Sequence, residues 1–187
     1  MNAYKSNYTV KSKVMDETDL QRVLSRIAHE IIEKNRGASN LAIIGMRTRG
    51  EFLAKRIASK IQEYEKAVIK VGILDVSFYR DDTRAKLRQP MVQSTEVPFD
   101  VNEMNIVLVD DVLFTGRSVR AALDAIMDFG RPNRVELAVL VDRGRRELPI
   151  QPDYVGKIVT TSPDEEIRVK MKECDDSDEV LLVNVEK

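Results

Sequence analysis

Short apolar runs alternate with segments of helical spacing along most of this chain, and this alternation restricts the fold more than any other feature. Residues 105–109 (NIVLV) form an almost continuous apolar run, which is typical of a strand in a parallel sheet covered on both faces. In the segments between such runs, apolar residues recur every three or four positions, as on one face of a helix. The sequence therefore predicts an α/β fold with a doubly wound central parallel sheet.

The same periodicities give the expected elements. We expect helices at about 19–35, at 51–64 and from about 118 to 129, and strands at 41–46, 68–79, 105–109 and 134–142, with shorter strands within 155–185. Residues 80–98 show no steady period and carry many charges, which predicts a long mobile loop or a β-arm. No linker-like segment divides the chain, so residues 1–187 are expected to form one domain, with 1–13 as a short N-terminal extension.

The composition excludes several classes of protein. Lys and Arg number 30 and Asp and Glu 31, so no overall field attracts nucleic acid or a membrane, and any anion site must be local. The single cysteine, Cys174, has no internal disulfide partner, and the polar N-terminus lacks the apolar core of a signal peptide. No apolar stretch approaches the ~20 residues that span a bilayer. We therefore expect a cytoplasmic protein without a membrane partner.

The stretch VDDVLFTGRS (109–118) places two carboxylates, Asp110 and Asp111, at the end of a predicted strand and a helix start near residue 118. Ligands of such sheets bind at the carboxyl ends of the strands, and a helix N-terminus with hydroxyl groups and a glycine favours a phosphate. The carboxylates would repel that phosphate, so they suit sugar hydroxyls or waters around Mg²⁺. This stretch predicts a sugar-phosphate site, and the alternative is an ordinary loop with a helix cap. Neither G-x-x-x-x-G-K-[ST] nor G-x-G-x-x-G occurs in the chain.

The stretch VLVDDVLFTGRS resembles the phosphoribosyl-diphosphate (PRPP) loop of type I phosphoribosyltransferases. Within that class, about residues 14 to 185 resemble the family of pyrimidine-operon attenuators and uracil phosphoribosyltransferases, PyrR. The resemblance rests on RIAHEIIEKN, GMRTRGEFLAKRIA, FYRDD, VDDVLFTGRSVRAALDAIMDFGRP and LAVLVDRGRRELPI. It implies a type I phosphoribosyltransferase fold with a flexible β-arm over the site and a small C-terminal hood at about 143–170. It further implies UMP and pyrophosphate formation from uracil and PRPP with Mg²⁺, and a homodimer or homotetramer. The Mg²⁺ would be carried by PRPP and water, without direct protein ligands.

Three sets of candidate residues concern PRPP, pyrophosphate and catalysis. PRPP would bind at Val109, Asp110, Asp111, Val112, Leu113, Phe114, Thr115, Gly116, Arg117 and Ser118. The basic turn Arg47, Thr48 and Arg49 would hold the pyrophosphate, and Arg80 in the arm would close over it; Asp110, Asp111, Arg49 and Arg80 are the catalytic candidates. The alternative for the basic turn and for Arg80 is a solvated surface position, and the alternative for Phe114 is a core position.

The base pocket is expected to suit a pyrimidine. Several purine-using relatives place a carboxylate where this chain has Phe114, and an aromatic side chain cannot act as an acid or base. The resemblance suggests Arg143 and Ile167 as the hood positions that line the uracil or UMP pocket.

Family members also bind the leader RNA of pyrimidine operons. The candidate RNA surface here is Ser25, Arg26, His29, Arg145, Arg146 and Lys157. RNA-binding relatives typically carry His where this chain has Arg145 and Arg where it has Gln151, and these departures concern RNA recognition rather than catalysis. Two alternatives to a regulatory enzyme stay open: an RNA-binding, UMP-sensing attenuator with little catalysis, and a phosphoribosyltransferase for another nucleobase.

Overall fold

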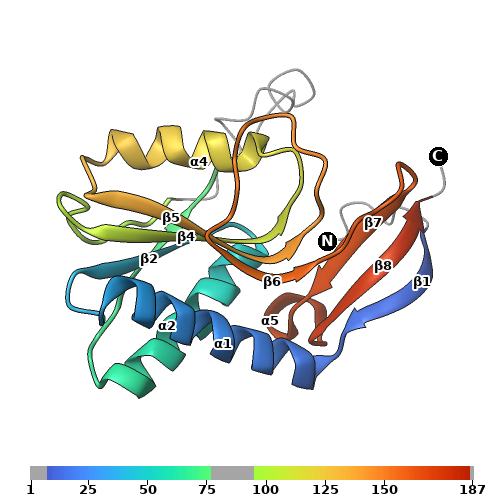
Figure 1. Ribbon diagram of the computed structural model, residues 1–187, viewed down its shortest axis with the longest axis horizontal. Coiled ribbons are helices and arrows are strands. Elements are labelled where there is room, and N and C mark those ends of the chain that lie inside the picture. The colour runs from blue at the N-terminus through green and yellow to red at the C-terminus, as the bar shows by residue number, and fades with distance from the viewer. Residues whose placement is uncertain (1–7, 77–94, 186–187) are drawn as a thin grey trace.

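Five parallel strands form the central sheet, in the order β3-β2-β4-β5-β6, and helices cover both of its faces (Figure 1). The computed structural model describes residues 8–76 and 95–185. The strands are β2 (Leu41–Met46), β3 (Lys70–Leu74), β4 (Asn105–Leu113), β5 (Arg134–Asp142) and β6 (Tyr154–Ile158), and the covering helices are α1 (Glu17–Asn35), α2 (Arg49–Glu65) and α4 (Arg117–Asp128). This arrangement confirms the predicted doubly wound α/β fold.

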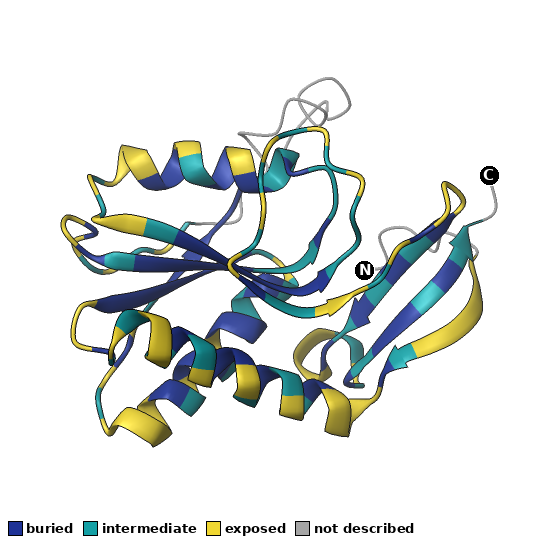
Figure 2. Ribbon diagram, viewed as in Figure 1, coloured by how far each residue is buried: buried dark blue, intermediate teal, exposed yellow. Residues whose placement is uncertain are grey.

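The core lies in two layers, one on each side of the sheet. Helix α4 covers one face, and α1 and α2 cover the other (Figure 1). All six residues of β2 are buried, and alternate side chains point to opposite faces, so Ile43 packs in the α1–α2 layer and Ile44 in the α4 layer. Figure 2 shows the buried residues concentrated on the central strands and on the inner sides of the helices. Among the described helices, none is both long and apolar enough to cross a membrane.

Helix α1 begins two residues earlier than the apolar spacing predicts, because a polar cap fixes its start. The side chain of Asp16 accepts a hydrogen bond from the Asp19 backbone N–H at 2.8 Å, and the Asp19 side chain accepts one from the Asp16 N–H. At the other end, Arg36 adopts the left-handed conformation with φ 55° and Gly37 follows with φ 107°, which ends the helix near the expected position.

A second, antiparallel sheet stands beyond the carboxyl ends of the central strands (Figure 1). It contains β1 (Tyr8–Met15), β8 (Glu179–Val185) and β7 (Glu165–Lys170), and the short helix α5 (Lys172–Asp175) joins β7 to β8. We expected residues 1–13 to be an extension, but the structure pairs Tyr8 with Val185 and continues the pairing to Met15. The expected hood at 143–170 also differs, because β6 belongs to the central sheet and the small sheet draws on both ends of the chain.

Most of the predicted arm at 80–98 lies outside the described residues, as does Arg80. Residues 95–98 are described, and Glu96 forms an antiparallel bridge with Ile73, with N–H to carbonyl distances of 2.7 and 2.8 Å. The strand predicted at 68–79 is shorter, since β3 ends at Leu74 and residues 77–79 are also outside the described range.

Candidate active site

The acidic pair lies within β4, near its carboxyl end, because the strand continues four residues further than its apolar run. Asp110 pairs with Val139 of β5, and Val112 pairs with Val141. The Asp110 carboxylate accepts a hydrogen bond from the Asp111 N–H at 2.9 Å, and the Asp111 carboxylate accepts one from the Val112 N–H at 2.8 Å. Burial raises the pKa of Asp111, and the nearby Arg49 guanidinium acts in the opposite direction. The pair is therefore held by local backbone groups.

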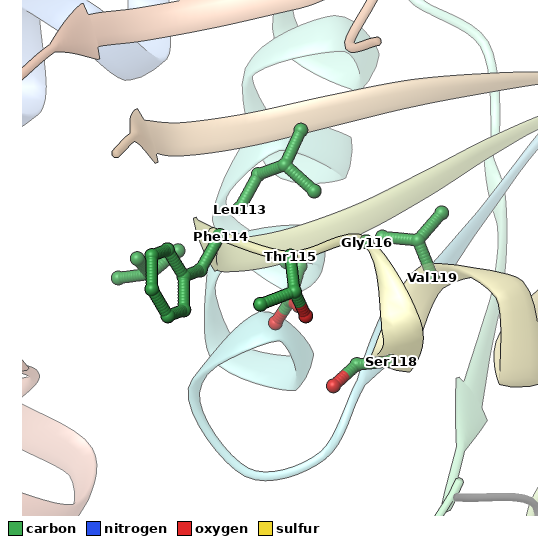
Figure 3. A pocket seen from close by; sticks show the side chains of 8 residues that line it. Leu113, Phe114, Thr115, Gly116, Ser118 and Val119 are labelled. Atoms are coloured by element: carbon green, nitrogen blue, oxygen red, sulfur yellow. The ribbon is translucent and has the colours of Figure 1, made fainter. Parts of the chain in front are cut away.

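The turn after β4 forms the start of α4. Gly116 adopts φ 92°, a conformation that favours glycine, and it occupies the N-cap without a side-chain hydrogen bond to the first turn. Backbone N–H groups at such an end suit an anion. A pocket at this turn is lined by Asp110, Val112, Leu113, Phe114, Thr115, Gly116, Ser118 and Val119. In Figure 3 the Thr115 and Ser118 hydroxyls lie on the same side of the turn. The Arg117 side chain instead pairs with Glu147 at 2.7 Å.

The turn between β2 and α2, residues 47–49, lies against the acidic pair. A Cβ on Gly50 would sit 2.6 Å from the Val109 carbonyl oxygen and 3.2 Å from Asp110 Cα, so only a glycine permits this approach of α2 to β4. The peptide bond between Arg47 and Thr48 is cis. The Arg47 guanidinium lies 3.6 Å from the Glu51 carboxylate and 3.4 Å from that of Glu96. The structure thus brings the predicted pyrophosphate turn beside the predicted PRPP segment.

A second pocket opens on the other side of Phe114. Its lining residues are Phe114, Arg143, Arg145, Pro163, Asp164, Glu166 and Val185. The Arg143 guanidinium carbon lies 4.1 Å from the centroid of the Phe114 ring, and its Nε donates to the Thr161 hydroxyl at 2.7 Å. Phe114 is half-buried and separates the two pockets, so it is not a core residue. The Ile167 side chain packs in the core and does not line this pocket, where its neighbour Glu166 is found.

Arg146, a candidate for the RNA surface, turns toward the predicted PRPP segment. Its guanidinium donates to the carbonyl oxygens of Phe114 at 2.9 Å, Ile150 at 2.9 Å and Gly144 at 3.2 Å. It also pairs with the Asp142 carboxylate at 2.7 Å. The stretch DRGRR indicated only a positive patch. In the structure, the Arg146 side chain instead supports the turn that carries Phe114.

The other RNA candidates lie in separate places. Arg26 on α1 donates to the Val155 and Gly156 carbonyl oxygens of β6, both at 2.8 Å, and so lies near Lys157. His29 stacks on the Tyr64 ring of α2 with centroids 4.2 Å apart. Ser25 is half-buried and donates to the Gln21 carbonyl, and Lys157 donates to the Val14 carbonyl. The side chains of Arg145 and Gln151 are exposed. The structure therefore places Arg26 against the backbone that precedes Lys157, and it places Arg145 and Arg146 beside the Phe114 pocket.

One residue beside the site, Asp175, was not predicted from the sequence. Arg49, the first residue of α2, donates from Nε and Nη2 to the Asp175 carboxylate at 3.1 and 2.8 Å. Asp175 lies on α5, next to the small sheet. The two residues are far apart along the chain, and nothing in the local pattern around 175 indicates a partner.

Comparisons with known proteins agree with this geometry. Residues 14–173 match the family model described as the phosphoribosyl transferase domain. The chain is 54% identical over 173 residues to the bifunctional protein PyrR of Pelotomaculum thermopropionicum, which covers 92% of this chain and 96% of that protein. It is 53% identical over 176 residues to the bifunctional protein PyrR of Deinococcus radiodurans, with 94% and 96% covered.

Solved structures are similar in fold. A hypoxanthine phosphoribosyltransferase of Trypanosoma cruzi superposes with a TM-score of 0.71 at 14% identity, covering 95% of this chain and 98% of that one. A hypoxanthine-guanine phosphoribosyltransferase of Bacillus anthracis gives a TM-score of 0.69 at 18% identity, covering 95% and 99%. At these identities the likeness concerns the backbone arrangement alone.

Proposed function

Because this chain belongs to the phosphoribosyltransferase family and, within it, to the PyrR proteins, we propose that it transfers the ribose 5-phosphate group of PRPP to uracil. The products are UMP and pyrophosphate. The observation that carries this proposal is the position of Phe114 between a phosphate-type pocket at the start of α4 and a second pocket closed by Arg143. A nucleotide needs such a pair of adjoining pockets, one for its phosphate and one for its base.

Different residues bind the phosphate, the ribose and the leaving group. The 5′-phosphate binds at the α4 N-terminus with the Thr115 and Ser118 hydroxyls, and Asp110 accepts hydrogen bonds from the ribose hydroxyls. As pyrophosphate leaves, positive charge develops at the anomeric carbon, so the site must hold both charges in place. The 47–49 turn receives the leaving group, and Arg80, outside the described residues, is proposed to close over it.

The donor chemistry of the site fits Mg²⁺ held through PRPP and water. Asp110 and Asp111 offer carboxylate oxygens at the strand ends, which suit the water shell of Mg²⁺. In residues 8–76 and 95–185 no cluster of three His, Cys, Asp or Glu side chains would hold a metal ion directly. When bound, Mg²⁺ neutralises charge on the pyrophosphate group.

The pocket beside Phe114 favours a pyrimidine. Phe114 offers a flat apolar surface and no acid or base, and Arg143 lies against its face. The backbone of β7, an edge strand of the small sheet, is proposed to read the carbonyl and N–H edge of uracil near Ile167, whose side chain faces the core.

The direct test is a product assay. The protein is incubated with PRPP, Mg²⁺ and, separately, uracil, guanine, hypoxanthine, adenine or orotate, and the nucleotides are identified by mass. We expect UMP from uracil and little product from the other bases. A purine nucleotide as the main product would move the assignment to another base, and no nucleotide from any base would contradict the enzymatic function.

We further propose that the chain binds pyrimidine-operon leader RNA, because its relatives are named bifunctional, which implies a second activity. Arg26, which donates to the Gly156 carbonyl oxygen, and Lys157, the next residue after Gly156, are the proposed phosphate contacts. Arg146 is unsuited as a test of this surface, because its loss would also disturb the turn that carries Phe114. The expected homodimer or homotetramer stays a prediction.

The RNA test compares a leader hairpin with a scrambled hairpin across a salt series, with and without UMP. Lys157→Ala should weaken leader binding and lower the salt slope by about 0.7 to 0.9 per lost phosphate contact. Arg120→Ala is the matched control, since Arg120 is exposed on α4, on the opposite face of the central sheet. Equal affinity for both hairpins, with no effect of UMP, would contradict the regulatory role and leave the catalytic one standing.

A further inference from the structure

The two-point contact between Arg49 and Asp175 joins the pyrophosphate turn to the small sheet. Arg49 is the first residue of α2 and sits directly before Gly50, which packs on the backbone of Val109 and Asp110. Its Nε and Nη2 both donate to the Asp175 carboxylate. A planar guanidinium held at two points cannot rotate freely, so this contact fixes its orientation as well as its place.

The geometry leaves one end of the guanidinium available. Nε and Nη2 form one edge of the group, and within the described part of the chain Nη1 of Arg49 donates to no protein acceptor. The side chain keeps 34% of its surface exposed, and it lies close enough to Asp111 for the two charges to interact. An anion that arrives at the 47–49 turn can therefore bind the Nη1 end while the other edge stays on Asp175.

Asp175 is itself held firmly. Its carboxylate accepts hydrogen bonds from the Met171 N–H and the Cys174 thiol, both at 3.1 Å. Helix α5 is docked on α2 at a second point, where Arg56 donates to Glu173 and Asp178 at 2.7 to 2.9 Å. Burial alone would raise the pKa of Asp175, but its hydrogen bonds with Arg49 and Cys174 hold that pKa below its ordinary value. The carboxylate is thus an ionised and fixed anchor at neutral pH.

We propose that Asp175 is a positioning residue for the reaction: it holds the Arg49 guanidinium in the orientation that receives the pyrophosphate group of PRPP. The inference rests on the proposed function, and it adds to that function a contact between the small sheet and the leaving-group site. A preorganised side chain need not be ordered when the ligand binds, so its contribution should appear in the binding of pyrophosphate-bearing ligands.

Asp175→Asn tests the proposal, because the amide keeps the size of the side chain but loses its charge and the two-point acceptor. We expect KM for PRPP and Kd for Mg²⁺-pyrophosphate to rise by about two- to tenfold, the cost of ordering one long side chain. UMP lacks the pyrophosphate group, so its Kd should not change. Asp175→Glu, which keeps a carboxylate, should restore part of the PRPP affinity.

Two controls separate positioning from a general loss of structure. Glu173→Gln changes the neighbouring contact of α5 with Arg56 and should leave KM for PRPP unchanged. In an Arg49→Met background, Asp175→Asn should have no further effect on PRPP binding, since the two residues act as one unit.

Several outcomes would overturn the inference. Tighter PRPP binding by Asp175→Asn would mean that the carboxylate competes with the anion, because removal of a negative charge alone favours anion binding. Unchanged KM, or an equal loss of UMP and PRPP binding, would show that the contact is only structural. A wild-type protein that binds no PRPP would refute the proposed function itself, which is a different result from all of these.

Discussion

Replacement of Gly50 by alanine tests the close approach of α2 to β4 on which the candidate site depends. The new Cβ would lie 2.6 Å from the Val109 carbonyl oxygen and 3.2 Å from Asp110 Cα. Both atoms belong to the backbone of a central strand, so neither can rotate away as a flexible side chain would. The start of α2 must therefore move away from β4, and the 47–49 turn moves with it.

Two effects on stability oppose each other in this variant, and their sizes decide the sign. Alanine is favoured over glycine inside a helix by about 1 kcal/mol. Overpacking at a close contact costs about 1–3 kcal/mol, so the net effect should be destabilising. The net loss is then up to about 2 kcal/mol, and since each kcal/mol lowers the Tm of a chain of this size by about 2–4 °C, we expect a fall of up to about 8 °C.

The catalytic effect should be larger than the stability effect. A displacement of about 1 Å at a reacting centre can cost on the order of a hundredfold in rate, so kcat/KM for PRPP should fall by at least about tenfold. The assays are thermal unfolding and UMP synthesis at varied PRPP. Ser59→Ala, at an exposed position of the same helix, is the control for helix propensity alone. If Gly50→Ala raised Tm and left KM for PRPP unchanged, the argument from close packing would be refuted.

Four further predictions concern single residues. Asp111→Asn should lower kcat/KM about ten- to a hundredfold, as expected for a lost charge-assisted hydrogen bond of about 1.5–3 kcal/mol. Because burial raises the pKa of Asp111, the ionised carboxylate destabilises the folded state at neutral pH, and Asp111→Asn should raise Tm at pH 7. This gain in Tm should shrink as the pH is lowered through the pKa of Asp111. Gly116→Val should abolish PRPP binding, and it should also lower Tm because valine does not readily adopt the φ of 92° found at this position. If the variant bound PRPP normally, the turn would be only a helix cap and not a phosphate site. Arg146→Ala should reduce UMP synthesis as well as RNA binding, and a selective loss of RNA binding would contradict its support of the turn. Burial and the hydrogen bond to the Asp175 carboxylate raise the pKa of the Cys174 thiol to about 11, so Cys174 should be alkylated slowly at pH 8 and faster in Asp175→Asn. Rapid alkylation of the wild type would contradict the raised pKa.

The central sheet was predictable because its signals are local. The strands at 41–46 and 134–142 have the predicted bounds, since a buried parallel strand is apolar along its whole length. Strand β4 was predicted too short, because the pairing of Asp110 and Val112 with β5 depends on a neighbouring strand and not on local hydropathy. The resemblance of VDDVLFTGRS to a PRPP loop located the candidate site through a contiguous motif.

The contacts that build the site across distant segments carried no such signal. In β1 the first six residues are exposed, so no alternation marks a strand whose partner lies at the far end of the chain. Arg146 and Asp175 look like ordinary surface charges in the sequence. Their roles depend on which backbone carbonyl or guanidinium the fold brings to them, and charge alone does not encode that.

The position of Phe114 connects the two proposed activities. Its ring faces Arg143 in the proposed base pocket, and its carbonyl oxygen accepts a hydrogen bond from Arg146. A nucleotide that moves or orders Phe114 would therefore act on residues 143–146 directly. Arg145, a candidate RNA contact, lies between those two arginines and is exposed. Binding linkage then requires that RNA held at Arg145 tighten UMP binding by the same factor by which UMP tightens RNA binding. An RNA affinity that UMP leaves unchanged would mean that RNA and UMP do not share this segment.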